Sequence, residues 1–339
     1  MNSRFLFVVG DQGDDVHQPL IRSLVLAQAL ADNGGACTIV ATPDVLGNLH
    51  ALAPSMTRAA AASDRCEDIA QTVARLEFDA IVFDHPSLSQ EDHIALSGDR
   101  PSVVIDDAAD RPIGGQIVVN PALTARPVDY EGLCLAGATI LTGPQFSPVV
   151  SDYAKLRSQG PKQCGPLRRV LLALGDRAPE ALVTQVIDQL RPRLGDAALD
   201  VLLPQEFNTL RGLSRVANRD PRLALHTLPL EYPLIAARSD LAITGTGASL
   251  WEACTLGLPI ISLSRRASDG AVAQRLAELD AAICLDFQDP AFDVRLERAF
   301  VRLGSDPTLR GKLSAKAATL TDGSGSQQVA QKLIGLLLR

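Results

Sequence analysis

Residues 241–259 constrain the fold more than any other stretch, because they combine a strand, a glycine-bearing turn and a helix in direct succession. A short apolar run ends in Thr-Gly-Thr-Gly-Ala-Ser, and from Leu250 onward the apolar residues have helical spacing. Such a turn directs unpaired backbone N–H groups and the positive end of the helix dipole at one point. Gly245 and Gly247 have no Cβ that would hold a ligand away. The stretch therefore predicts an α/β fold with a phosphate site at the start of this helix.

Two interpretations of this helix start are open on spacing alone. Glu252 lies about one turn into the helix, where its carboxylate, which only accepts hydrogen bonds, would bind both hydroxyls of a ribose. A nucleotide would then contact Gly247, Ala248, Ser249 and Glu252. Ser249 and Glu252 also have the spacing of a capping box, in which the two side chains satisfy backbone N–H groups of the helix end. The two interpretations can hold together.

Length and composition limit the number of domains and the partners. The 339 residues exceed an ordinary domain of about 100 to 200 residues, so we expect two domains. Aromatic residues make up 4% of the chain and hydrophobic residues 46%, which favours helices layered on parallel strands. The net charge of -7 gives no overall attraction for nucleic acid or an anionic membrane. An anionic ligand must therefore be held locally.

The cysteines and the apolar runs indicate the compartment. The six cysteines form no CxxC motif and have no histidine at metal-ligand spacing, so we expect reduced thiols, no metal and no cofactor. The apolar run at the N-terminus is too short for a signal peptide, and no run approaches the roughly 18 to 20 residues that span a bilayer. We expect a cytoplasmic protein without a membrane span or bound nucleic acid, as a monomer or weak oligomer.

The first half of the chain alternates buried strands with helices. We expect strands at 4–10, 37–42, 78–83, 103–105 and 117–119. We expect helices at 20–30, 44–52 and 58–75, and a turn-rich crossing at 141–149. His17 lies in the loop after the first strand, at the sheet edge where open α/β sheets bind ligands, so it is a candidate catalytic residue. Arg22, one turn into the next helix, is a candidate anion ligand; an exposed histidine and a solvated arginine are the alternatives.

Polar residues also follow three later strands of this half. Asp84 and His85 end one strand, Asp106 and Asp107 the next, and Asn120 the third. Parallel pairing would bring them to one edge, where Asp84 and His85 are candidate catalytic residues and Asp107 and Asn120 candidate substrate ligands. The same residue types also cap loops at strand ends, and this alternative is open.

The second half repeats the pattern after a break. The Gly- and Pro-rich residues 159–167 predict a linker between two Rossmann-like domains, 1–158 and 168–322. The remaining 323–339 form a last helix that we expect to pack back towards the first domain. We expect strands at 170–174, 199–203, 223–227, 241–243, 259–263 and 282–285, and helices at 180–190, 232–237, 290–303, 308–320 and 326–338. Gly175 ends the first of these strands, and the helix after it is a second candidate phosphate contact.

A set of short motifs resembles one known family in order and spacing. The motifs occupy 81–85, 104–107, 117–120, 143–146 and 247–253. Along nearly its whole length the chain is similar to the UDP-sugar hydrolases of pseudaminic acid synthesis. These release UDP from UDP-2,4-diacetamido-2,4,6-trideoxy-β-L-altropyranose and are relatives of spore-coat polysaccharide and flagellin-modification proteins. The resemblance implies the GT-B fold, with two Rossmann-like parallel-sheet domains facing across a cleft.

The resemblance also implies roles for single residues. Residues 247–252 would hold uridine diphosphate, with Ala248 and Ser249 at the diphosphate and Glu252 on the ribose. His17 would deprotonate a water that attacks the anomeric carbon, without a metal. The glycines that precede this histidine in the family are replaced here by Asp15 and Val16.

The sequence thus predicts a hydrolase whose partner is a UDP-linked diacetamido-trideoxyhexose, split into UDP and free sugar for flagellin or surface glycosylation. Two alternatives are open. One is a glycosyltransferase that passes the same kind of sugar to an acceptor. The other is a catalytically silent UDP-sugar binding protein, an alternative that the altered histidine loop favours.

Overall fold

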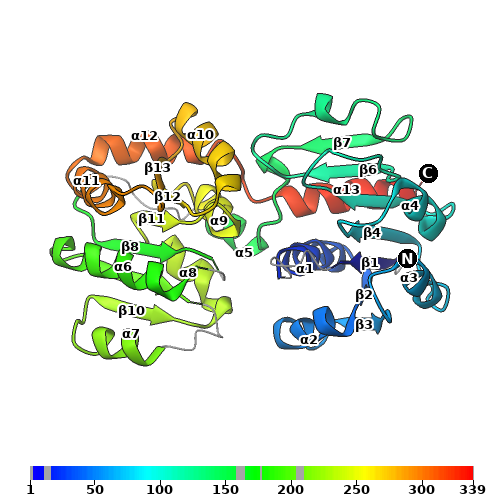
Figure 1. Ribbon diagram of the computed structural model, residues 1–339, viewed down its shortest axis with the longest axis horizontal. Helices are drawn as coiled ribbons and strands as arrows, with labels where there is room; N and C mark the ends of the chain where they lie inside the picture. Colours follow the sequence, from blue (N-terminus) through cyan, green and yellow to red (C-terminus); the bar gives the residue numbers. More distant parts are fainter. Residues whose placement is uncertain (1–2, 11–16, 158–164, 176–177, 204–209, 339) are drawn as a thin grey trace. The chain divides into compact units, whose positions relative to one another are not determined.

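The chain packs as two compact units, each built around one parallel sheet (Figure 1). The computed structural model describes residues 3–10, 17–157, 165–175, 178–203 and 210–338. Unit 1 comprises Met1–Val149 with Ser324–Arg339, and unit 2 comprises Val150–Gly323. The division therefore lies at Val150, ahead of the predicted linker 159–167, of which 159–164 fall outside the described residues.

Unit 1 contains a seven-stranded sheet in which every strand pair is parallel. In spatial order the strands are β3 (Thr57–Ala60), β2 (Ala36–Ala41), β1 (Arg4–Val9), β4 (Ala80–Asp84), β5 (Ser102–Ile105), β6 (Ile117–Asn120) and β7 (Thr139–Thr142). The central strands β1, β4, β5 and β6 are buried almost throughout, as expected for a sheet covered on both faces. Five strand predictions are confirmed.

Two segments of unit 1 that were predicted as something else differ in the structure. The alanine-rich stretch 58–75 begins as strand β3, and only Cys66–Val73 is helical (α3). Alanine favours helix in isolation, but pairing of β3 with β2 overrides that preference. The stretch 141–149 is likewise more than a crossing, because Thr139–Thr142 adds β7 to the edge of the sheet beside β6.

The helices of unit 1 include the last helix of the chain. They are α1 (His17–Asp32), α2 (Pro43–Leu52), α3, α4 (Gln90–Ser97) and α13 (Gly325–Leu337). Helix α13, red in Figure 1, packs against α1 and contributes Val329 and Leu333 to the same core as the apolar face of β1. A Cβ on Gly325 would lie 2.6 Å from the backbone of Phe146, so only glycine allows α13 to begin so close to that segment.

Unit 2 contains a six-stranded parallel sheet. Its spatial order is β10 (Leu223–His226), β9 (Ala198–Leu202), β8 (Arg169–Ala173), β11 (Leu241–Thr244), β12 (Ile260–Ser264) and β13 (Ile283–Asp286). All six were predicted, with ends that differ by a residue or so. The helices are α5 (Ser151–Leu156), α6 (Glu180–Leu190), α7 (Leu210–Ala217), α8 (Tyr232–Ala237), α9 (Ala248–Leu256), α10 (Gly270–Glu278), α11 (Phe292–Ser305) and α12 (Pro307–Ala317).

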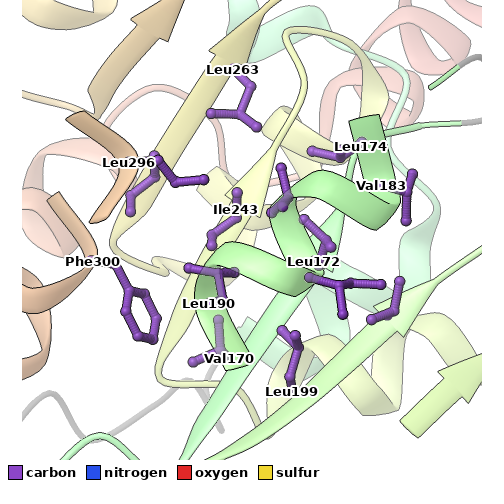
Figure 2. Close-up of a cluster of buried hydrophobic side chains, with 14 of the residues drawn as sticks. Val170, Leu172, Leu174, Val183, Leu190, Leu199, Ile243, Leu263, Leu296 and Phe300 are labelled. Carbon is purple, nitrogen blue, oxygen red and sulfur yellow. The ribbon is translucent and has the colours of Figure 1, made fainter. Parts of the chain in front are cut away.

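The core of unit 2 forms where α6 and α11 pack on the sheet. Figure 2 shows Leu190 of α6 and Phe300 of α11 beside Val170 of β8 and Ile243 of β11, all of them buried. Each such side chain contributes roughly 1.5 to 3 kcal/mol by leaving water. This packing holds the carboxyl ends of β8 and β11 side by side, where the glycine turns follow.

Within the described ranges of the chain, no helix is both long enough and apolar enough to cross a bilayer.

Candidate functional site

Helix α9 begins without a side-chain cap. Its N-cap residue is Gly247, and no described side chain accepts a hydrogen bond there. Strand β11 ends at Thr244, so the turn is short and Ser249 falls inside the first helical turn. The capping-box interpretation of Ser249 and Glu252 is therefore wrong. The first N–H groups of α9 have no intrahelical acceptor, and this arrangement binds phosphate in many proteins.

The glycine before this helix has a structural cause. A Cβ on Gly245 would lie 2.8 Å from the carbonyl oxygen of Leu174, which follows the neighbouring strand β8. Close approach of the two strand ends therefore requires a glycine at 245, whether or not a ligand binds. Gly175, the next residue along, has φ +85°, a left-handed conformation that glycine adopts readily, and it is exposed at the same edge.

The loop after β12 is joined to the turn after β11. Asp269 accepts hydrogen bonds from the backbone N–H of Arg265 at 2.8 Å and of Arg266 at 3.0 Å, and from the side chain of Thr246. Burial alone would raise the pKa of Asp269, but these donors lower it below its ordinary value. The ionised carboxylate therefore ties a loop with two arginines to the glycine turn, and gives this edge local basic residues in an acidic chain.

Glu252 lies one turn into α9 and is half-buried. It accepts a hydrogen bond from the hydroxyl of Tyr153 on α5, a side chain that is 2% exposed. Burial, and then the Glu252 carboxylate, raise the pKa of Tyr153 well above its ordinary value, so the hydroxyl keeps its proton and donates. The sequence analysis missed Tyr153, because α5 is a short helix outside the alternating pattern and nothing in its residues points to α9.

At the corresponding edge of unit 1, a buried ion pair connects β4 to α1. Arg22 donates from Nε to Oδ2 of Asp84 at 2.7 Å and from Nη2 to Oδ1 at 2.6 Å, and from Nη1 to Asp107 at 2.8 Å. Burial alone would lower the pKa of Arg22, but the two carboxylates raise it. Burial raises the pKa of Asp84, and Arg22 opposes that effect. Both oxygens of Asp84, a candidate catalytic residue, are thus held by the guanidinium.

His85, the second candidate of that strand end, is 2% exposed. Its Nδ1 accepts a hydrogen bond from the Ser87 N–H at 3.3 Å, and its Nε2 lies 3.5 Å from Asp64 Oδ1. A Cβ on Gly10 would lie 2.6 Å from the ring, so the end of β1 covers this imidazole. Burial lowers the pKa of His85, which keeps the ring neutral at pH 7.

Asn120 belongs to a buried polar network at the ends of β5 and β6. Its Nδ2 donates to the Tyr130 hydroxyl at 2.9 Å, and its Oδ1 accepts from the Ala122 N–H at 3.0 Å. Tyr130 in turn donates to Asp106 at 2.8 Å. Asp106 also accepts from the Ala109 N–H at 2.7 Å. These contacts match the loop-capping alternative for the strand ends, with Asn120 only 3% exposed.

The structure brings Arg22, Asp84 and Asp107 together but does not describe the side chain of His17. His17 is the first residue of α1, but its side chain and the preceding residues 11–16 lie outside the described part of the chain. Its catalytic role stays a prediction. Within the described residues, no cluster of histidine, cysteine, aspartate and glutamate could hold a metal ion.

A small pocket lies beside Arg22 in unit 1. It has a volume of about 20 Å³, enough for about one water molecule. Its lining is mostly apolar and includes Ile105, Phe146 and Val329. The pocket is too small for a sugar.

Comparison with known proteins gives one similar sequence. No family model matches the chain. Over 227 residues it is 26% identical to the spore coat polysaccharide biosynthesis protein SpsG of Bacillus subtilis (strain 168). The match covers 66% of this chain and 63% of SpsG, less than two thirds of that relative's length.

Solved structures match over nearly the whole chain. MurG of Acinetobacter baumannii has a TM-score of 0.64 at 17% identity and covers 98% of this chain and 99% of its own. The glycotransferase of kitacinnamycin has a TM-score of 0.67 at 14% identity, covering 99% of each chain. The spinosyn rhamnosyltransferase SpnG, complexed with thymidine diphosphate, has a TM-score of 0.64 at 15% identity, covering 100% of each. At such identities the likeness shows the fold alone, and it confirms the predicted GT-B class.

These comparisons correct the predicted activity. The structures that share the fold include a glycotransferase and a rhamnosyltransferase, so the assignment as a hydrolase is wrong. The family resemblance is confirmed only as far as the spore-coat relative and the GT-B fold. The transferase alternative of the sequence analysis is the better supported one.

Proposed function

We propose that this protein transfers a sugar from a nucleoside diphosphate to an acceptor, and that the nucleotide binds at the carboxyl edge of the sheet in unit 2. One observation carries the proposal: the uncapped start of α9 presents its N–H groups one turn from a half-buried carboxylate, Glu252. A diphosphate at the helix start would accept hydrogen bonds from those N–H groups, and the hydroxyls of a ribose would donate to Glu252.

The same arrangement provides for the leaving group. As the glycosidic bond breaks, negative charge develops on the diphosphate. The N–H groups of Ala248 and Ser249 and the dipole of α9 would stabilise that charge. The loop that carries Arg265 and Arg266, held to Thr246 through Asp269, would add cationic groups at this edge. Gly175 would contribute backbone at the neighbouring strand end.

The proposed donor is a UDP-sugar. A carboxylate that accepts from both ribose hydroxyls favours uridine diphosphate over thymidine diphosphate, whose deoxyribose has one of the two hydroxyls. The solved SpnG structure contains thymidine diphosphate, so the preference of this chain between uridine and thymidine diphosphate has to be measured. The relative SpsG is named for spore coat polysaccharide biosynthesis, which favours a sugar of a surface polysaccharide. The first donor to test is a UDP-diacetamido-trideoxyhexose, the sugar nucleotide that the motif resemblance implies.

Unit 1 would activate the acceptor. We assign His17 the role of general base that takes a proton from the acceptor hydroxyl. The ion pair of Asp84 with Arg22 would act at one remove, because it fixes helix α1, which begins with His17. His85, Asp107 and Asn120 would shape the same edge. We also propose that the protein is cytoplasmic and is a monomer or a weak oligomer.

The test is acceptor dependence of UDP release. The purified protein is incubated with a panel of UDP-amino sugars, with and without a mixture of polysaccharide-derived acceptors. We expect release that rises steeply with acceptor, a glycosylated product by mass spectrometry, and loss of both in His17→Ala. Equal release with and without acceptor contradicts the proposal. Tight UDP binding without turnover of any donor would favour the silent binding protein.

A further inference from the structure

Helix α5 opens unit 2 and packs directly against α9. Tyr153 lies in the middle of α5, and its hydroxyl reaches Glu252. Arg157, one turn later, donates from Nη1 to the carbonyl oxygen of Thr255 at 2.7 Å. Residues four apart lie on one face of a helix. Tyr153 and Arg157 therefore contact α9 from the same side, one at Glu252 and the other at Thr255.

The remaining contacts of Arg157 make this support rigid. Its Nη1 also donates to the carbonyl oxygen of Thr321 at 2.9 Å, and its Nη2 to that of Ala318 at 2.7 Å. Gly323 lies against the same place, because a Cβ there would lie 2.7 Å from Thr255. The position of Tyr153 is therefore fixed, because hydrogen bonds join the end of its helix to α9 and to the residues after α12.

The chemistry of the Tyr153 contact suits a ligand-binding carboxylate. A glutamate side chain has several rotatable bonds, and binding loses affinity when those bonds must be frozen at the moment of contact. A phenol hydroxyl removes that freedom in advance. It occupies one of the roughly four acceptor positions that a carboxylate has, which is compatible with further hydrogen bonds from two ribose hydroxyls. Because the phenol is neutral, it adds no charge of its own beside the carboxylate.

We propose that Tyr153 is a positioning residue, which holds the Glu252 carboxylate in the orientation that accepts both ribose hydroxyls of the nucleotide. This inference rests on the proposed function, since it requires a ribose at Glu252. It goes beyond that proposal by assigning ribonucleotide selectivity in part to a residue that does not touch the ligand.

The first experiment compares two ligands by calorimetry on the full chain. The ligands are UDP and 2′,3′-dideoxyuridine diphosphate, which lacks both ribose hydroxyls. We expect Tyr153→Phe to bind UDP about 3- to 10-fold more weakly, the usual effect of one lost hydrogen bond, and to bind the dideoxy ligand as the wild type does. In the background of Glu252→Ala, Tyr153→Phe should cause no further loss.

The control variant is Tyr130→Phe. Tyr130 is also buried and also donates to a carboxylate, that of Asp106, but it lies in unit 1. Its change should leave the affinity for both ligands unaltered. An equal loss of both ligands in Tyr153→Phe would mean a merely structural role and overturn the inference.

The two proposals fail in different ways. If Glu252→Ala weakens UDP binding and a folded Tyr153→Phe does not, the positioning role falls and the nucleotide site stands. If Glu252→Ala leaves UDP affinity unchanged, the site itself falls.

A measurement on the unaltered residue covers the case in which Tyr153→Phe does not fold. The chain has three tyrosines, so labelling with 3-fluorotyrosine gives three fluorine signals. Tyr130→Phe and Tyr232→Phe assign two of them, and the third is Tyr153. We expect UDP to shift the Tyr153 signal and the dideoxy ligand to leave it in place. A Tyr153 signal that responds to neither ligand, or equally to both, overturns the inference.

Discussion

The two units present a carboxylate at the same kind of place and hold it in opposite ways. Asp84 of unit 1 is 1% exposed, and both of its oxygens are paired with the Arg22 guanidinium. Glu252 of unit 2 is half-buried and accepts from a neutral phenol. A fully enclosed carboxylate that is paired with a guanidinium on both oxygens has no surface left for a ligand, whereas a half-buried carboxylate still exposes part of its surface. The partner and the exposure of each acid, more than its place near the carboxyl edge of a sheet, separate the two roles.

The largest expected effect is on unit 1. Arg22→Ala leaves the buried Asp84 without its counter-ion, and loss of one partner of a buried pair costs about 3 to 5 kcal/mol. Urea unfolding should show this loss, and the double variant Arg22→Met with Asp84→Leu should recover most of it. The control is Arg126→Ala, because Arg126 is 71% exposed in its pair with Asp129 and should change little. An Arg22→Ala protein as stable as the control would break the comparison.

Acid should also act on unit 1 first. Burial is the main cause that lowers the pKa of His93 to about 4, below the ordinary value of about 6.5, and this histidine is 0% exposed. Because the unfolded chain binds the proton more readily, stability is full above about pH 6.5 and is lost as the pH falls towards 4. The shift corresponds to about 3 kcal/mol at most.

The measurement is stability against pH by thermal melting, compared with His93→Gln. The variant should lose much of this slope between pH 6.5 and 4, because glutamine takes up no proton. An identical slope in both proteins would assign the acid sensitivity to other groups, of which His85 is the first to examine.

The next effect concerns binding in unit 2. Glu252→Ala should weaken UDP binding by roughly 1.5 to 3 kcal/mol, the range for hydrogen bonds to a charged group, while the fold stays intact because the side chain is only half-buried. Calorimetry with UDP measures the loss. Asp107→Ala, a carboxylate at the edge of unit 1, is the matched control and should bind UDP normally. If Asp107→Ala weakens UDP binding and Glu252→Ala does not, the ligand-binding carboxylate is in unit 1 and the comparison is reversed.

The smallest effect tests the glycine turn. Gly245→Ala places a methyl group 2.8 Å from the Leu174 carbonyl, which should cost about 1 to 3 kcal/mol of stability through overpacking, without any ligand present. Gly304→Ala is the control, because nothing lies within 4 Å of its Cβ and alanine favours the helix α11. The control should be neutral or slightly stabilising. If Gly245→Ala is as stable as the wild type and loses only UDP affinity, the glycine is required for ligand binding and not for the close packing against Leu174.

Much of the fold could be read from local patterns. The strands β1, β4 and β8 are continuous apolar runs because a parallel sheet is covered on both faces, and the predicted helix 180–190 has the bounds of α6. The edge strand β3 escaped prediction because its alanines form a strand only when β2 is beside them. Helices α4, α5, α7 and α10 were also missed.

The candidate site divides in the same way. The glycine turn and α9 form one continuous segment, so the sequence alone determined that the first N–H groups of a helix would follow a buried strand, with Glu252 one turn into that helix. What each acid then contacts was decided only by tertiary structure. Arg22 meets Asp84 across 62 positions of the chain, and Tyr153 meets Glu252 because α5 packs on α9. Local periodicity specifies where a side chain begins, but its partner depends on long-range packing, which no local pattern encodes.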